Sequence, residues 1–255
     1  MAKLDLPTVT LCAATSVNVP ATIAALEACL AQVTFADCCL FTDADVTTAS
    51  KGIRIVPIER LTSASAYSDF ILKRLADHVR TPHCLVVQWD GFVLDAGCWD
   101  PGFLAFDYIG APWPQFDDAH CVGNGGFSLR SRKLLAACQD PEFRSGHPED
   151  VAICRVNRPL LESRHGIRFA DKKTAERFSF ERSATGEPTF GFHGIFNMIP
   201  VLGAGRFWKV YRTLDDPSTA LVDFATLLRQ LGSGRFALRR RARLTLARLR
   251  GLFRR

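Results

Sequence analysis

The chain has 255 residues, of which 47% are hydrophobic and 23% charged, an ordinary globular composition that excludes wholesale disorder. No apolar run approaches the ~20 residues that a bilayer-spanning helix needs, and residues 1–7 lack the features of a secretory signal. The nine cysteines are odd in number and scattered, with no Cys-x-x-Cys pair. We therefore expect reduced thiols and a cytoplasmic protein.

The formal net charge of +6 comes from the C-terminal end of the chain. Nine of the 32 basic residues are arginines between 233 and 255, where no acidic residue occurs. Residues 1–232 carry the other 23 basic and all 26 acidic side chains, a net charge of −3. We expect one domain over residues 1–232 and a basic tail over residues 233–255. Because the body is not globally positive, no nucleic-acid partner is expected.

Short apolar runs alternate with helical segments through the first half of the chain. The predicted elements are a strand over Thr8–Ala14, a helix from Pro20 to about Val33, strands over Cys38–Asp43 and Ile53–Ile58, a helix over Tyr67–His78 and a strand over Cys84–Asp90. This alternation predicts an α/β fold with a mostly parallel central sheet flanked by helices. Ligands of such sheets bind beyond the carboxyl ends of the strands, where Asp43 and Asp90 lie.

The second half of the chain is less regular. Its predicted elements are an aromatic segment over Phe103–Trp113, a glycine-rich turn over Val122–Phe127, helices over Ser131–Cys138 and from Glu149 to about Ser163, and a short strand over Ile167–Phe169. Ser131 is expected to cap the helix that follows it.

Asp90 and His193 are candidate metal ligands. Asp90 ends an apolar strand before a glycine, which suits Mg²⁺ or Mn²⁺ because these ions prefer oxygen ligands. Alone, however, Asp-Gly is more often a turn that caps a strand. His193 lies in the run Phe-Gly-Phe-His-Gly, where flanking glycines permit close approach to a cation. A lone histidine beside aromatic rings is more often a packing residue.

Two further segments are candidates for ligand chemistry. Residues 123–127 read Gly-Asn-Gly-Gly-Phe, and because glycine has no side chain the backbone of this segment can approach a ligand closely. A tight turn with no ligand has the same composition. The spacing of these glycines fits neither a phosphate loop nor a dinucleotide fingerprint. Glu149 and Asp150 open a predicted helix, where the helix dipole favours acids. The alternative is that Asp150 is a general base for a sugar hydroxyl and that Glu149 positions the acceptor.

Together, and in this order, the four segments resemble the hallmarks of glycosyltransferases with the GT-A fold. The strings Gln-Trp-Asp-Gly-Phe-Val, Gly-Asn-Gly-Gly-Phe-Ser-Leu-Arg-Ser, Pro-Glu-Asp-Val and Phe-Gly-Phe-His-Gly are also similar to those of a little-characterised bacterial family of GT-A-like proteins, over about residues 9–199. The first acid of the superfamily's Asp-x-Asp motif is Gln88 here, so Asp90 would have to make the metal contact.

The resemblance implies a role for each segment. Mn²⁺ or Mg²⁺ would be held by Asp90 and His193, and Asp150 would be the catalytic base, with Glu149 beside it. The acceptor side would be shaped by the loop residues Asn124, Gly125, Gly126 and Phe127. The donor pocket would be lined by Thr15, Asp43, Gln88, Trp89 and Asp90, with Tyr67 and Asp69 as weaker candidates.

The implied function is transfer of a sugar from a nucleotide-sugar donor to a hydroxyl of a glycan or lipid-linked acceptor, with inversion and with Asp150 as the base. A UDP-sugar is expected because the Asp43 carboxylate could accept a hydrogen bond from uracil N3–H. Three alternatives stay open: a retaining transferase, a non-catalytic nucleotide-sugar- or glycan-binding protein, and a nucleotidyltransferase. The last would want more acids around Asp90.

The basic tail has helical periodicity. One predicted face carries Leu238, Ala242, Thr245, Leu246, Leu249, Leu252 and Phe253, and the other carries most of Arg239, Arg240, Arg243, Arg250 and Arg254. Such a helix can lie among anionic headgroups, so we expect residues 233–255 to hold the enzyme on the inner face of the cytoplasmic membrane. There it would meet acceptors of cell-envelope polysaccharide synthesis, such as lipopolysaccharide. A disordered solubilising tail and a nucleic-acid contact are the alternatives.

Overall fold

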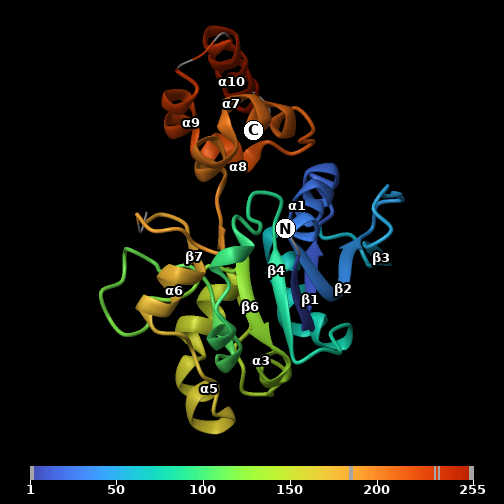
Figure 1. Cartoon of the computed structure of the whole chain (residues 1–255), viewed down its shortest axis with the longest axis vertical. Helices are drawn as coiled ribbons and strands as arrows, with labels where there is room; N and C mark the ends of the chain where they lie inside the picture. The colour runs from blue at the N-terminus through green and yellow to red at the C-terminus, as the bar shows by residue number, and fades with distance from the viewer. Residues whose placement is uncertain (1–2, 184–185, 233, 235, 253–255) are drawn as a thin grey trace. The chain divides into compact units, whose positions relative to one another are not determined.

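A computed structural model describes residues 3–183, 186–232, 234 and 236–252 (Figure 1). It divides into two compact units, residues 1–193 and residues 194–255. The boundary expected after residue 232 therefore falls inside the second unit. The reason is that the helices on either side of that position, over Phe224–Gln230 and Ala237–Leu252, contact each other.

The first unit is built on a six-stranded sheet with the order β3-β2-β1-β4-β6-β5 (Figure 1). The strands are β1 (Leu4–Ala14), β2 (Val33–Thr42), β3 (Arg54–Pro57), β4 (His83–Val87), β5 (Tyr108–Ile109) and β6 (Phe127–Ser131). Strands β3, β2, β1 and β4 are parallel, whereas β6 runs against both of its neighbours. The predicted α/β class, with a mostly parallel sheet flanked by helices, is confirmed.

Helices cover both faces of the parallel part, because side chains alternate along each strand. Cys39 and Phe41 of β2 pack with Phe70 and Ile71 of α2 (Ala64–Lys73), in a cluster that also includes residues of β1 and β4. Cys38 points to the other face, beside α1 (Val19–Gln32). This two-sided burial explains why the strands read as continuous apolar runs. Helix α2 begins at Ala64, earlier than predicted, because the Ser63 side chain accepts a hydrogen bond from the backbone of Ala66.

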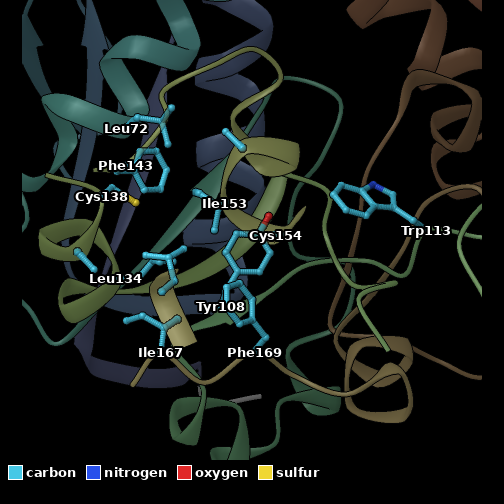
Figure 2. Packing of buried hydrophobic residues seen from close by; sticks show 13 residues of the cluster. Leu72, Tyr108, Trp113, Leu134, Cys138, Phe143, Ile153, Cys154, Ile167 and Phe169 are labelled. Atoms are coloured by element: carbon cyan, nitrogen blue, oxygen red, sulfur yellow. The ribbon is translucent and has the colours of Figure 1, made fainter. Parts of the chain in front are cut away.

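A second core lies under the less regular half of the first unit (Figure 2). It joins Tyr108 of β5 to buried residues of several short helices, among them Leu134, Ile153 and Leu161, and to Ile167, which follows the last of these helices. These helices are α3 (Arg132–Ala137), α4 (Glu149–Val151), the π-helical turn η4 (Ala152–Val156) and α5 (Arg158–His165). The smaller elements of this unit are η1 (Leu75–Asp77), η2 (Ala96–Cys98), η3 (Pro101–Ala105), α6 (Lys172–Phe178), β7 (Ser179–Phe180) and β8 (Gly191–Phe192).

Two predictions for this half need correction and one is confirmed. The helix predicted from Glu149 to Ser163 is broken at Asn157, whose side-chain amide donates to the carbonyls of Arg144 and Ala152. The strand predicted over Ile167–Phe169 is a single bridge between Phe169 and Tyr108. Ser131 caps α3 as expected, since its side chain accepts a hydrogen bond from the backbone of Leu134.

The second unit is helical. It contains α7 (Ile195–Tyr211), which is kinked at Gly203, and then α8 (Ser218–Val222), α9 (Phe224–Gln230) and α10 (Ala237–Leu252). The helix predicted in the basic tail is thus present, although Ser233, Phe253 and Arg254 lie outside the described residues. Within the part of the chain that the structure describes, no helix combines the length and the apolar character needed to cross a membrane. All nine cysteines are free.

Candidate functional site

Several predicted donor residues lie at the carboxyl edge of the parallel strands. Thr15 follows β1, Asp43 follows β2, and Gln88, Trp89 and Asp90 follow β4. These three strands are neighbours in the order β2-β1-β4, so their ends meet at one edge of the sheet. The strand order also reverses direction between β1 and β4, which is where open α/β sheets bind ligands.

The structure brings His193 and Asp90 together although 103 residues separate them in the chain. Nε2 of His193 lies 3.5 Å from Oδ1 of Asp90 and 3.2 Å from the amide oxygen of Gln88. Nδ1 of the same ring lies 3.2 Å from Oε1 of Glu181, a residue that the sequence analysis did not single out. Asp90 is almost completely buried. Burial alone would lower the pKa of His193, but Asp90 and Glu181 outweigh it and raise that pKa to about 10.

Asp90 and His193 could supply two ligands to a hard divalent cation. Ligands at right angles around an ion with bonds of about 2.1 Å are about 3.0 Å apart, so the 3.5 Å between Asp90 and His193 requires only a small adjustment. No group of three or more His, Cys, Asp or Glu side chains that could hold a metal ion occurs among the described residues. Two protein ligands are compatible with Mg²⁺ or Mn²⁺, since such ions commonly keep waters and substrate phosphates as the remaining ligands.

The glycine-rich loop is packed between His193 and Glu149. A Cβ atom on Gly126 would lie 2.0 Å from Nε2 of His193, and a Cβ on Gly125 would lie 2.0 Å from Oε1 of Glu149. Both positions therefore require glycine for close approach. Asn124 has a positive φ of 64°, and its side-chain oxygen accepts a hydrogen bond from the backbone of Gly126. Its buried Nδ2 has no hydrogen-bond partner among the described residues.

Asp150 touches the same loop. Its Oδ2 accepts a 3.0 Å hydrogen bond from the backbone N–H of Gly125, and its Oδ1 accepts one from Val151. Burial raises the pKa of Asp150 above its ordinary value, and the neighbouring Glu149 raises it further. A carboxylate with a raised pKa is a stronger base than an exposed one. Asp150 and His193 thus contact neighbouring residues of one loop, and Asp90 lies beside His193.

Glu149 has partners that the sequence did not suggest. Its Oε1 accepts a 3.1 Å hydrogen bond from Nη2 of Arg130, and Ser68 lies 3.5 Å from its Oε2. Arg130 is completely buried and also reaches the carbonyl of Gly125. Both oxygens of Glu149 therefore face protein groups. No signal in the sequence indicated this role of Arg130, because the strand Phe-Ser-Leu-Arg-Ser that carries it alternates apolar and polar residues and was not predicted as a buried strand.

Three further candidates, Tyr67, Trp89 and Phe127, differ in how close they lie to the site and in how deeply they are buried. Tyr67 lies close to the site, because Glu149, Arg130 and Gln88 all influence the pKa of its hydroxyl. Burial is the main cause that raises this pKa above its ordinary value. Trp89 is largely buried. The ring of Phe127 is fully buried against Phe178 and Phe190, so only its backbone is free to shape an acceptor side.

Asp69 is not part of this group. It is exposed and pairs with Lys73, and it lines a cavity of about 790 Å³ between the end of β3 and α2.

Comparisons with known proteins give a family and a likeness to solved structures. No curated protein matches the chain in sequence. A similar solved structure is titled "Crystal structure of a glycosyltransferase involved in the glycosylation of the major capsid of PBCV-1"; it shares 11% sequence identity and a TM-score of 0.45, over 81% of this chain and 100% of that one. The sequence profile described as "Protein of unknown function (DUF5672)" matches residues 51–193. Because this match covers more than half of the chain, the protein belongs to the DUF5672 family.

Proposed function

We propose that the protein is a metal-dependent glycosyltransferase of the GT-A type that uses a nucleotide-sugar donor, with UDP as the expected nucleotide. One observation carries this proposal. A single short loop, residues 124–126, contacts a carboxylate of raised pKa on one side and the Asp90–His193 pair on the other. Transfer to a hydroxyl needs a base and a place for the departing diphosphate a few ångströms apart, and this loop separates two groups suited to those tasks.

In the proposed reaction Asp150 accepts the proton of the acceptor hydroxyl through whichever carboxylate oxygen the acceptor approaches. The hydrogen bond from Gly125 orients that carboxylate. The hydroxyl oxygen then forms a bond to the anomeric carbon while the bond to the diphosphate breaks, with inversion of configuration. Asp90 and His193 would hold a Mn²⁺ or Mg²⁺ ion, which when bound stabilises negative charge on the diphosphate.

The positions of Thr15, Asp43 and Gln88 support the donor end of the proposal, because all three follow neighbouring parallel strands at the switch point of the sheet. The unpartnered Nδ2 of Asn124 supports the binding of a sugar, because this buried amide group can donate a hydrogen bond to a sugar hydroxyl. Glu149 takes a supporting role in place of the expected contact to the acceptor. Its pairing with Arg130 fixes the start of α4, on which Asp150 lies.

The proposed acceptor is a hydroxyl of a glycan or lipid-linked molecule, met on the cytoplasmic side of a membrane. The arginines of residues 233–255 support this placement, because anionic lipid attracts a basic segment. The proposal does not extend to the identity of the sugar.

Replacing Asp150 by Asn tests the catalytic assignment. General-base catalysis is commonly worth about 10²–10⁴-fold, so D150N should lose turnover by about that factor while donor affinity stays within about twofold. The matched control is D5N, the same chemical change on an exposed carboxylate near the start of β1. Normal turnover by D150N would show that Asp150 is not the base.

A non-catalytic binding protein is the second candidate, favoured by Gln88 standing where the superfamily has an acid. A thermal-shift screen of nucleoside diphosphates and nucleotide sugars, with and without Mn²⁺, identifies the ligand in either case, because specific binding raises apparent stability by mass action. Release of free nucleoside diphosphate in the presence of an acceptor then distinguishes the enzyme from the binding protein.

A further inference from the structure

Helix α10 presents an exposed apolar surface that the rest of its own unit does not cover. The helix packs against α9, and Leu244 is its completely buried side chain. Leu238, Leu246 and Leu249 remain 81%, 51% and 46% exposed. Exposed leucines are ordinary when isolated, but three on one helix form a pattern.

The three leucines form a continuous stripe together with Ala242. At 100° per residue they fall within an arc of about 80°, on the side of the helix opposite Leu244. The expected apolar face is therefore present and faces away from the rest of the unit. Leu244, the side chain that holds α10 to its unit, is a residue that the sequence pattern did not place on that face. We call Leu238, Ala242, Leu246 and Leu249 the leucine stripe.

Arginines border the leucine stripe on both sides. Arg239, Arg243 and Arg250 occupy the next positions around the helix in one direction. In the other direction Arg241 and Arg248 follow beyond Thr245 and Leu252. All five are exposed, and the helix contains no acidic residue. Long arginine side chains beside an apolar stripe can reach a layer of negative charge while the stripe lies deeper.

We propose that the leucine stripe inserts into an anionic lipid surface, with the bordering arginines on the lipid phosphates. Charge and geometry favour this occupant over two others. A second copy of the chain would bring two sets of arginines together with no acid on either helix to pair with them. A nucleic acid would be met by arginines across the whole contact face, whereas here leucines occupy its centre. The inference concerns the second unit alone and does not depend on the transferase proposal.

The test uses the full-length protein and sedimentation with vesicles of phosphatidylcholine, with or without 30–40% phosphatidylglycerol (roughly the charge of an anionic leaflet). The triple variant L238S/L246S/L249S removes the stripe and should bind anionic vesicles at least tenfold more weakly. V222S is the matched control, because Val222 is 80% exposed on α8, and its binding should be unchanged. R239Q/R243Q/R250Q should bind more weakly and lose much of the salt dependence.

A second readout tests insertion directly. In L246W the new indole should shift its emission to the blue on anionic vesicles and be quenched by lipids brominated in the acyl chain. Wild-type binding by the leucine variant, or an indole that stays in water, would overturn the proposal. The proposal would also be overturned if light scattering showed a wild-type dimer and a monomeric leucine variant. The same holds if a DNA duplex bound the protein and displaced the vesicles. Circular dichroism and Mn²⁺-dependent UDP binding, measured on the same variants, separate misfolding and loss of the donor site from loss of lipid binding.

Discussion

The two sides of the loop at residues 124–126 differ in how their charges are satisfied. On the Asp150 side the buried Arg130 neutralises Glu149, and Asp150 is left with a raised pKa. On the other side the single ring of His193 faces Asp90, Glu181 and the amide oxygen of Gln88. The same glycines thus contact both groups of the proposed reaction. Asp150 on one side would be the base, and Asp90 and His193 on the other would hold the cation beside the diphosphate.

The largest expected effect on stability comes from breaking the buried ion pair on the Asp150 side. Arg130→Met leaves the Glu149 carboxylate buried without its partner, which should reduce the free energy of unfolding by about 3–5 kcal/mol. Urea denaturation measures this change, with the exposed neighbour in R132M as the control.

The double variant R130M/E149Q sharpens this prediction. Removing both charges takes away the uncompensated carboxylate, so the double variant should be more stable than R130M alone. Equal or lower stability would show that the pair does not act as a unit.

A smaller effect should separate the two sides of the loop. Gly125→Ala forces a methyl group into Glu149, and Gly126→Ala forces one into His193. Each should cost about 1–3 kcal/mol of stability. G125A should chiefly lower turnover, whereas G126A should chiefly weaken Mn²⁺-dependent donor binding.

Steady-state kinetics and donor titration measure the two effects. G146A is the control, because nothing lies within 4 Å of a Cβ at Gly146. If G125A and G126A lose turnover and Mn²⁺-dependent donor binding to the same extent, the two sides of the loop do not have separate roles.

The smallest effect concerns pH. Because the pKa of Asp150 is raised in the folded protein, its ionisation opposes folding: the contribution to stability is fully present below the ordinary pKa of an aspartate and is lost as pH rises through the folded value. D150N should therefore be slightly more stable than the wild type at neutral pH. Turnover should fall as pH drops through that same raised pKa. Thermal unfolding and a pH–rate profile check the two halves, and a profile flat down to pH 4 would contradict the assignment.

Local patterns predicted the parallel half of the sheet well. Strands β1, β2 and β4 are buried on both faces and read as apolar runs, and the Ser131 cap was visible because a hydroxyl precedes a helical pattern. The site was predicted as a set of segments, and the structure places Asp90, His193 and Asp150 around one loop.

Long-range pairings could not be predicted. Nothing local indicates that Arg130 meets Glu149 or that Glu181 meets His193. The antiparallel strand β6 was hidden because its pairing with β4 is fixed by residues forty positions away. The break at Asn157 also depends on a distant partner, the backbone of Arg144.

Calorimetric titration of UDP into the protein, with and without Mn²⁺, tests most directly whether Asp90 and His193 form the proposed donor site. The wild type and the control D5A should bind UDP with Mn²⁺ and much more weakly without it, and D90A should lose at least tenfold of the Mn²⁺-dependent affinity. Equal affinity in D90A and wild type, or no binding of UDP or any other nucleoside diphosphate, would contradict the site.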